Sequence, residues 1–298
     1  MNSPKSPSNI GLWILAARPK TLWAAAAPVV IGTAMAYEAG GGVLLPALAA
    51  LFGSIMIQVG TNLANDYFDY KKGADGHDRL GPIRVTQAGL VKPKTMKRAV
   101  AVAFLLACTA GAYLVWRAGW PIAVIGVLSV LCGVLYTAGP YPLGYIGLGD
   151  VFVLIFFGPV AVGGTYYVQT LDMDGMVVLA GLAPGLFSVA ILTVNNLRDI
   201  NEDRTAGKKT LAVRFGQTFS RMEYLLSIVI ASAMPVFLSL SNQEHFYSCL
   251  TVVVPLVALP AVRKVFASND GPVLNHVLAT TGKLLLLYSL IFSVGWLL

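Results

Sequence analysis

Nine long, predominantly apolar stretches occupy most of this chain, and they limit what it can fold into. A helix needs about 20 consecutive apolar residues to cross the hydrocarbon core of a bilayer. A helix also satisfies its own backbone hydrogen bonds where no water is available. We therefore predict an all-α integral membrane protein with nine transmembrane helices, at residues 21–37, 44–64, 99–116, 120–138, 151–169, 176–194, 223–240, 246–262 and 279–297.

The composition agrees with this prediction and excludes a soluble domain. Hydrophobic residues make up 56% of the 298 residues and charged residues only 12%, whereas about 25% of a soluble domain is charged. The mean hydropathy is +0.72. We expect one polytopic domain over residues 1–298, with the lipid bilayer as its surroundings and with neither a nucleic acid nor an obligate protein as partner.

The distribution of Lys and Arg predicts the orientation, because cytoplasmic loops retain positive charge. If the N terminus is cytoplasmic, the outer loops are roughly residues 38–43, 117–119, 170–175 and 241–245. Of the 21 Lys and Arg residues in the chain, only Arg117 lies in those loops. We therefore predict a multi-pass protein of the cell (inner) membrane, with its N terminus and its two most charged loops in the cytoplasm.

Those two charged loops begin with similar motifs. "NLANDYFDYKKGAD" at 62–75 and "NNLRDINEDRTAGKK" at 195–209 each place an asparagine at the end of an apolar stretch and carboxylates at four-residue intervals after it. The motifs are 130 residues apart, which corresponds to four helices with their loops. This spacing predicts two parallel four-helix repeats plus a ninth helix, arranged around a central cavity.

The spacing of the acids within the motifs suggests a metal site. Asp199 and Asp203 would lie on one face of a helix, where like charges repel, and a bound cation would remove that repulsion. Carboxylate oxygens suit Mg²⁺, which usually takes one or two protein carboxylates and completes its shell with waters and substrate phosphate. Neighbouring Lys and Arg residues would hold the remaining phosphate charge. The alternative is that both motifs are ordinary solvated loops.

Several blocks of the chain resemble the UbiA-type intramembrane prenyltransferases, and within them the branch that prenylates 1,4-dihydroxy-2-naphthoate in menaquinone biosynthesis. Besides the two motifs, these blocks are "ARPKT" (17–21), "GPIRVTQAGL" (81–90), "YPLGYIGLGD" (141–150) and "FFGPVAVGGTYY" (156–167). The resemblance implies a nine-helix bundle with a central cavity. It also implies Mg²⁺-dependent transfer of an isoprenoid chain from a polyprenyl diphosphate to the dihydroxynaphthoate, with loss of CO₂ and diphosphate.

The metal ligands that the resemblance implies follow the family motifs. The family's NxxxDxxxD motif falls on Asn65, Asp69 and position 73, and its DxxxD motif falls on Asp199 and Asp203. Position 73 is glycine here, so the third ligand of the first motif stays open between Asp66 and Asp75. Gly73 could equally end the helix, as glycines often do just past a helix C-terminus.

The remaining roles are expectations from the same resemblance and from residue chemistry. Arg84 and Lys208 or Lys209 are candidates to hold the leaving diphosphate, and Asn65 and Asn195 are candidates to contact the substrate. Tyr136, Tyr141 and Tyr145 could face the allylic cation, although tyrosines also gather at membrane interfaces. Asp150 could orient the acceptor or complement a helix dipole.

Other functions fit part of the pattern. A transporter of an anionic amphiphile would also place charges at the end of repeated halves, and a lipid-binding scaffold would need no chemistry. Within the family, 4-hydroxybenzoate or homogentisate are alternative aromatic acceptors. Diphosphate release in the presence of Mg²⁺ would exclude both rival functions, and a panel of acceptors would distinguish the aromatic substrates.

Overall fold

The computed structural model of the chain describes residues 8–73, 80–81 and 83–298, and every regular element in this part is helical. The elements are α1 (Asn9–Ala17), α2 (Pro19–Glu38), α3 (Leu44–Lys72), α4 (Pro93–Ala118), α5 (Trp120–Leu135), α6 (Gly149–Phe156), α7 (Pro159–Thr170), α8 (Gly175–Ala180), α9 (Leu182–Arg198), α10 (Ile200–Thr205), α11 (Leu211–Asn242), the 3₁₀ helix η1 (Phe246–Val253), α12 (Val254–Ala267) and α13 (Gly271–Leu297).

Each predicted apolar stretch coincides with one helix or with one broken helix. Seven helical segments in the described part are long and apolar enough to cross a bilayer, and α1 with α2, bent by 56°, makes an eighth if the pair is one span. Helix α5 has 16 residues and is shorter than these. The structure thus confirms a multi-pass helical architecture, while the number of nine crossings stays a proposal.

Two predicted helices are broken in their interior by close contact between glycines. Helix α6 ends before Gly158 and helix α8 ends before Gly181, and the two breaks meet each other. A Cβ atom on Gly181 would lie 2.7 Å from Pro159 Cα, and one on Gly158 would lie 2.6 Å from the Gly181 carbonyl oxygen. Only residues without a side chain allow the two backbones to approach this closely. The length of an apolar stretch does not reveal such a contact, so each stretch was predicted as one continuous helix.

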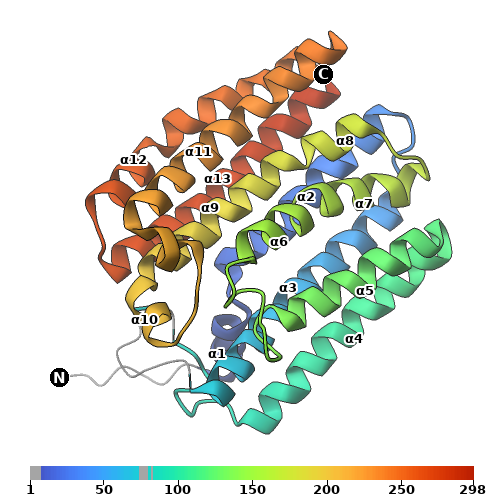
Figure 1. Cartoon of the computed structure of the whole chain (residues 1–298). Helices are drawn as coiled ribbons and strands as arrows, with labels where there is room; N and C mark the ends of the chain where they lie inside the picture. Colours follow the sequence, from blue (N-terminus) through green and yellow to red (C-terminus); the bar gives the residue numbers. More distant parts are fainter. Residues whose placement is uncertain (1–7, 74–79, 82) are drawn as a thin grey trace.

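The helices form one bundle with its loops at two ends (Figure 1). Helix α3 packs along α4, and α9 packs along α11. Helix α13 lies against both α2 and α9, and buried aliphatic and aromatic side chains of these three helices belong to the largest apolar core. Helices α1 and α10 lie at the same end of the bundle as the charged end of α3, whereas the C terminus lies at the opposite end (Figure 1).

Residues 62–72 of the first motif belong to a helix rather than to a loop. Helix α3 continues eight residues beyond the predicted boundary at residue 64 and ends at Lys72. Gly73 then adopts the left-handed conformation (φ 62°, ψ 27°), and its backbone N–H donates to the Asp69 and Tyr70 carbonyl oxygens. This confirms the alternative in which Gly73 ends the helix. The second motif lies where α9 passes into α10, and the Asp203 backbone N–H donates to the Asp199 carbonyl oxygen at 2.8 Å.

Candidate active site

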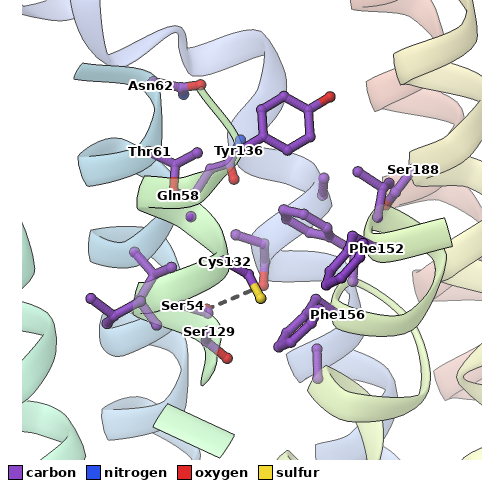
Figure 2. A pocket seen from close by; sticks show the side chains of 18 of the residues that line it. Ser54, Gln58, Thr61, Asn62, Ser129, Cys132, Tyr136, Phe152, Phe156 and Ser188 are labelled. Atoms are coloured by element: carbon purple, nitrogen blue, oxygen red, sulfur yellow. Dashed lines mark hydrogen bonds between the residues drawn. The ribbon is translucent and has the colours of Figure 1, made fainter. Parts of the chain in front are cut away.

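A cavity of about 570 Å³ extends from the two motifs into the bundle. On one wall, α3 presents polar side chains at successive turns, and α6 presents aromatic rings on the other (Figure 2). Phe152 and Phe156 lie nearly parallel, with ring centroids 6.1 Å apart and an interplanar angle of 5°. The charged side chains of the motifs line one end of this cavity, so a ligand with an anionic head and an apolar body would match its two ends.

The first motif places Asn65 and Asp69 one turn apart on α3, and both line the cavity. Asp69 is buried. It accepts hydrogen bonds from Arg84 Nη2 at 2.7 Å and from the Tyr145 hydroxyl at 3.0 Å. Asn65 Oδ1 accepts a hydrogen bond from the Thr137 hydroxyl. The connection after α5 and the loop before α4 are therefore both held to the first motif.

Asp66 has a different position from that expected of a metal ligand. It is buried and does not line the cavity. Its two carboxylate oxygens accept the backbone N–H groups of Val85 and Thr86 at 3.0 and 3.1 Å. Asp66 therefore fixes the backbone next to Arg84, and the structure does not place it with the carboxylates that line the cavity. The other candidate, Asp75, lies outside the described residues.

The second motif brings Asp199, Asp203 and Lys208 to the same end of the cavity. Lys208 Nζ pairs with Asp203 Oδ1 at 2.9 Å. Arg198 holds both oxygens of Asp199 at 2.6 Å through Nε and Nη2, and its Nη2 also donates to Asn195 Oδ1 at 2.8 Å. Arg198 itself is buried and does not line the cavity, whereas Asn195 does. Each of the three carboxylates at the cavity end thus has a basic partner.

Tyr145 connects the two motifs. Its hydroxyl donates to Asp69, and its ring lies 4.6 Å from Lys72 Nζ and 5.0 Å from Lys208 Nζ. Cations at this distance from the face of a ring are attracted to it. Burial and the neighbouring Asp69 carboxylate raise the pKa of Tyr145 above its ordinary value, so the hydroxyl stays protonated and continues to donate.

The electrostatics of Asp203 favour an additional cation. Burial raises the pKa of Asp203 above its ordinary value, Lys208 opposes this shift, and Asp199 and Asp69 add to it. The three carboxylates are therefore close enough to influence one another. A positive charge placed among them would favour the ionised form of Asp203.

Besides Asp66, three expected site residues do not line the cavity. Tyr141 is 79% exposed, which agrees with the interface reading rather than with a site role. Lys209 is exposed and contributes its backbone N–H to the Tyr145 carbonyl oxygen, so Lys208 is the lysine that faces the cavity. Asp150 lies buried in the first turn of α6, and its Oδ1 has no hydrogen-bond partner among the described residues. Tyr136 does line the cavity, with its hydroxyl against Gly149.

Sequence reasoning did not identify several residues that the structure brings to the site. Arg198 and Lys72 belong to the two motifs, but no specific role was predicted for them. Arg18, in the "ARPKT" block, lines the cavity at the bend between α1 and α2. A polar stripe on α3 was a detectable signal, because an apolar helix carries polar groups at turn spacing only where they face an interior. This stripe comprises Ser54, Gln58, Thr61 and Asn62.

The residues at the cavity end fit a magnesium–diphosphate group better than a bare metal ion. Among the described residues, no three Asp, Glu, His or Cys side chains gather closely enough to hold a metal by themselves. Mg²⁺ commonly takes one or two protein carboxylates and the remaining oxygens from phosphate and water. Asp69, Asp199 and Asp203 offer such oxygens, while Arg84 and Lys208 offer positive charge for phosphate.

Comparison with known proteins agrees with this geometry. The sequence pattern of the UbiA prenyltransferase family matches residues 25–296. The chain belongs to this family. UbiA-family relatives named 1,4-dihydroxy-2-naphthoate octaprenyltransferase are 37% identical in Escherichia coli (95% of this chain, 94% of the relative) and 36% identical in Haemophilus influenzae (95% of each). The protein of that name in Mycobacterium tuberculosis is 38% identical over 93% of this chain and 94% of its own length.

Solved structures share the UbiA fold. A UbiA homolog from Archaeoglobus fulgidus, bound to GPP and Mg²⁺, superposes with a TM-score of 0.66, at 14% identity over 96% of this chain and 100% of that one. A UbiA homolog from Aeropyrum pernix K1 without ligand gives the same score at 15% identity, covering 92% of this chain and 96% of that one. At these identities the likeness establishes the fold of the bundle.

Proposed function

We propose that this UbiA-family protein transfers an isoprenoid chain from a polyprenyl diphosphate to 1,4-dihydroxy-2-naphthoate, releasing CO₂ and diphosphate and giving demethylmenaquinol. The proposal rests mainly on the cavity. Three carboxylates, each paired with a basic side chain, lie at one end of it, and its deeper part inside the bundle is lined by apolar side chains. The naphthoate acceptor is supported by the relatives named 1,4-dihydroxy-2-naphthoate octaprenyltransferase, which are 36–38% identical to this chain over at least 93% of its length.

The basic residues at the cavity end are proposed to bind the diphosphate. In the structure, Arg84 pairs with Asp69 and Lys208 pairs with Asp203. We propose that these two bases also donate to the phosphate oxygens of the substrate, because arginine and lysine form charge-assisted hydrogen bonds with phosphate as well as with carboxylate. Charge developing on the leaving diphosphate is then stabilised by groups already in place.

We propose Asp69, Asp199 and Asp203 as the carboxylates that hold Mg²⁺, and we leave Asp66 out because its oxygens are occupied by backbone N–H groups. Bound Mg²⁺ would neutralise charge on the leaving diphosphate as a Lewis acid. Asn65 and Asn195 line the same end and are proposed to contact the substrate or its metal-bound waters.

The deeper part of the cavity is proposed to protect the allylic cation until it meets the aromatic ring. Tyr136, Phe152 and Phe156 present aromatic faces there, which stabilise positive charge and exclude water. The bond between the donor's first carbon and the diphosphate oxygen breaks, and that carbon bonds to the carboxyl-bearing ring carbon. The carboxyl group then leaves as CO₂, and its bonding electron pair returns to the ring.

The test of this function is product formation by the purified protein. With Mg²⁺, geranylgeranyl diphosphate and dihydroxynaphthoate, we expect release of diphosphate together with a prenylated, decarboxylated product, measured by mass spectrometry. With 4-hydroxybenzoate or homogentisate as acceptor, we expect much slower turnover. Faster product formation with either alternative would reassign the acceptor, and no turnover with any acceptor would overturn the proposed activity.

The proposed architecture is one domain over residues 1–298 with nine membrane crossings. It comprises two parallel four-helix repeats and α13 as the ninth helix. Equivalent neighbours support the repeat, since α3 packs along α4 in the first half and α9 along α11 in the second. Each of the four predicted outer connections, at residues 38–43, 117–119, 170–175 and 241–245, contains the end of one helix and the break before the next, as this topology requires.

We further propose that both motifs face the cytoplasm and that the protein resides in the cell (inner) membrane. Single cysteines at Ala206, in the turn after α10, and at Gly76, outside the described residues, are to be introduced into a cysteine-free background. An impermeant thiol reagent is expected to label both in inside-out vesicles and neither in right-side-out vesicles. Labelling from the outer side would reverse the orientation.

A further inference from the structure

Asn275, in the second turn of α13, makes a hydrogen bond with each half of its side-chain amide. Its Oδ1 accepts from Arg198 Nη1 at 2.6 Å, and its Nδ2 donates to the Leu80 carbonyl oxygen at 3.0 Å. Arg198 belongs to the second motif, and Leu80 belongs to the loop that follows the first motif. One side chain of α13 therefore contacts both the second motif and the loop that follows the first motif.

The contact with Arg198 bears on the orientation of Asp199. The Arg198 side chain is only 1% exposed, and it donates to Asp199, Asn195 and Asn275. Because a guanidinium group is planar and rigid, fixing it at Nη1 also fixes the direction of the carboxylate that it holds on its other side. Asp199 lines the cavity, whereas Arg198 and Asn275 do not. Asn275 therefore affects the site indirectly, through Arg198.

The contact with Leu80 bears on the position of Arg84. The Leu80 backbone is held on both sides, since its N–H donates to Glu202 Oε1 of α10 at 2.8 Å and its carbonyl accepts from Asn275. Gly271, one turn before Asn275, packs directly on Leu80, and a Cβ atom there would lie 3.0 Å from Leu80 Cβ. Four residues after Leu80, Arg84 reaches Asp69.

We propose that Asn275 is a positioning residue that couples the two Asp motifs. It orients Asp199 through Arg198 and holds the Arg84 loop through Leu80, so that the carboxylates of one motif and the base beside the other converge on the same diphosphate. This inference rests on the proposed function. It also gives α13, which has no counterpart in the proposed repeats, a specific task in the site.

The test replaces Asn275 with leucine, which is similar in size and makes no hydrogen bond. Residues that orient metal ligands typically alter metal affinity or activity by about 10–100-fold when they are replaced. For Asn275→Leu we expect losses of that order in kcat and in the apparent Mg²⁺ affinity, with the KM of the aromatic acceptor within about threefold. Calorimetric titration with inorganic diphosphate in the presence of Mg²⁺ should show a similar fall in affinity.

Two further variants separate positioning from a general packing effect. Asn275→Gln keeps the amide on a longer side chain, so we expect it to recover part of the loss. Gly271→Ala pushes on Leu80 and leaves the Arg198 contact in place, so we expect a smaller loss of the same kind. These two variants also decide the question if Asn275→Leu does not fold: unchanged kinetics and diphosphate affinity in both would overturn the proposal.

The chain offers a matched control. Asn269 Oδ1 accepts from Arg221 Nη2 at 2.9 Å, a bond of the same chemical type between residues that do not line the cavity. Asn269→Leu should retain wild-type parameters. If Asn269→Leu loses as much activity and diphosphate affinity as Asn275→Leu, or if Asn275→Leu keeps its kcat, Mg²⁺ dependence and diphosphate affinity, the coupling role is wrong.

Failure of the proposed function gives a different result. If the wild-type protein binds magnesium–diphosphate but transfers no prenyl group, the proposed function is wrong, and the comparison of diphosphate affinities still tests Asn275.

Discussion

Replacing Asp199 or Asp203 with asparagine is expected to reduce prenyl transfer by roughly 10²–10³-fold, the usual cost of losing one preorganised group that stabilises developing charge. Both carboxylates line the charged end of the cavity. The substitution removes ligand charge at the place where the diphosphate leaves. The rate is to be measured per folded protein at several Mg²⁺ concentrations, and raising Mg²⁺ should recover part of the loss.

The loop before α8, at the end of the bundle opposite to the two motifs in the proposed topology, supplies the control for these variants. Asp172 and Asp174 accept the backbone N–H groups of Met173 and Met176, both at 2.8 Å, and both of these hydrogen bonds are exposed. Asparagine can accept the same bonds and is an equally good helix cap. Asp172→Asn and Asp174→Asn should therefore leave turnover within about twofold and its Mg²⁺ dependence unchanged. If Asp199→Asn keeps near-normal turnover with unchanged Mg²⁺ dependence, the second motif does not bind the metal and is an ordinary solvated loop.

The ion pairs of Asp199 and Asp203 change the expected stability of Asp199→Asn and Asp203→Asn. From spacing alone, each asparagine would relieve repulsion between Asp199 and Asp203, and stability would hold. In the structure, however, Asp199 is the bidentate partner of the buried Arg198. Removing one partner of a buried pair costs about 3–5 kcal/mol. We therefore expect Asp199→Asn to lower the Tm clearly. Asp203→Asn should lower it less, because the side chain of Lys208 is 19% exposed and can turn to solvent.

Arg84→Ala is expected to lower kcat/KM for the prenyl donor by roughly 100-fold or more, because the variant loses a charged donor aimed at the leaving group. Arg84→Lys keeps the charge and loses the planar, bidentate geometry, so partial activity should remain. The KM of the aromatic acceptor should change much less than that of the donor. Steady-state kinetics with each substrate varied in turn measure this difference.

The control for Arg84 is Arg98, an exposed base near the start of α4 that does not line the cavity. Exposed charges contribute little to stability or to a distant site, so Arg98→Ala should behave as wild type. If Arg84→Ala keeps both its donor KM and its kcat, Arg84 has no part in the site.

Much of the site was accessible from sequence because its residues share one helix. Asn65 and Asp69 are four positions apart, and helical periodicity places such residues on one face whatever surrounds them. The same reasoning could not separate Asp66 from Asp69. Both lie on α3 and both are buried, but one carboxylate accepts backbone N–H groups from the loop and the other faces the cavity. That difference depends on where residues 83–86 return to the helix.

The sequence by itself determined that the chain forms apolar helices in a membrane, because uncharged stretches of about 20 residues match the length of a membrane-spanning helix, which satisfies its own backbone hydrogen bonds there. It also determined that acids and bases gather where α3 and α9 end. The tertiary structure decided which of them meet. Lys208 rather than Lys209 faces the cavity, glycines break two spans where their backbones touch, and Asn275 reaches Arg198 from 77 positions away. These contacts join helices distant in the chain, and local periodicity carries no information about which faces of two such helices will pack together.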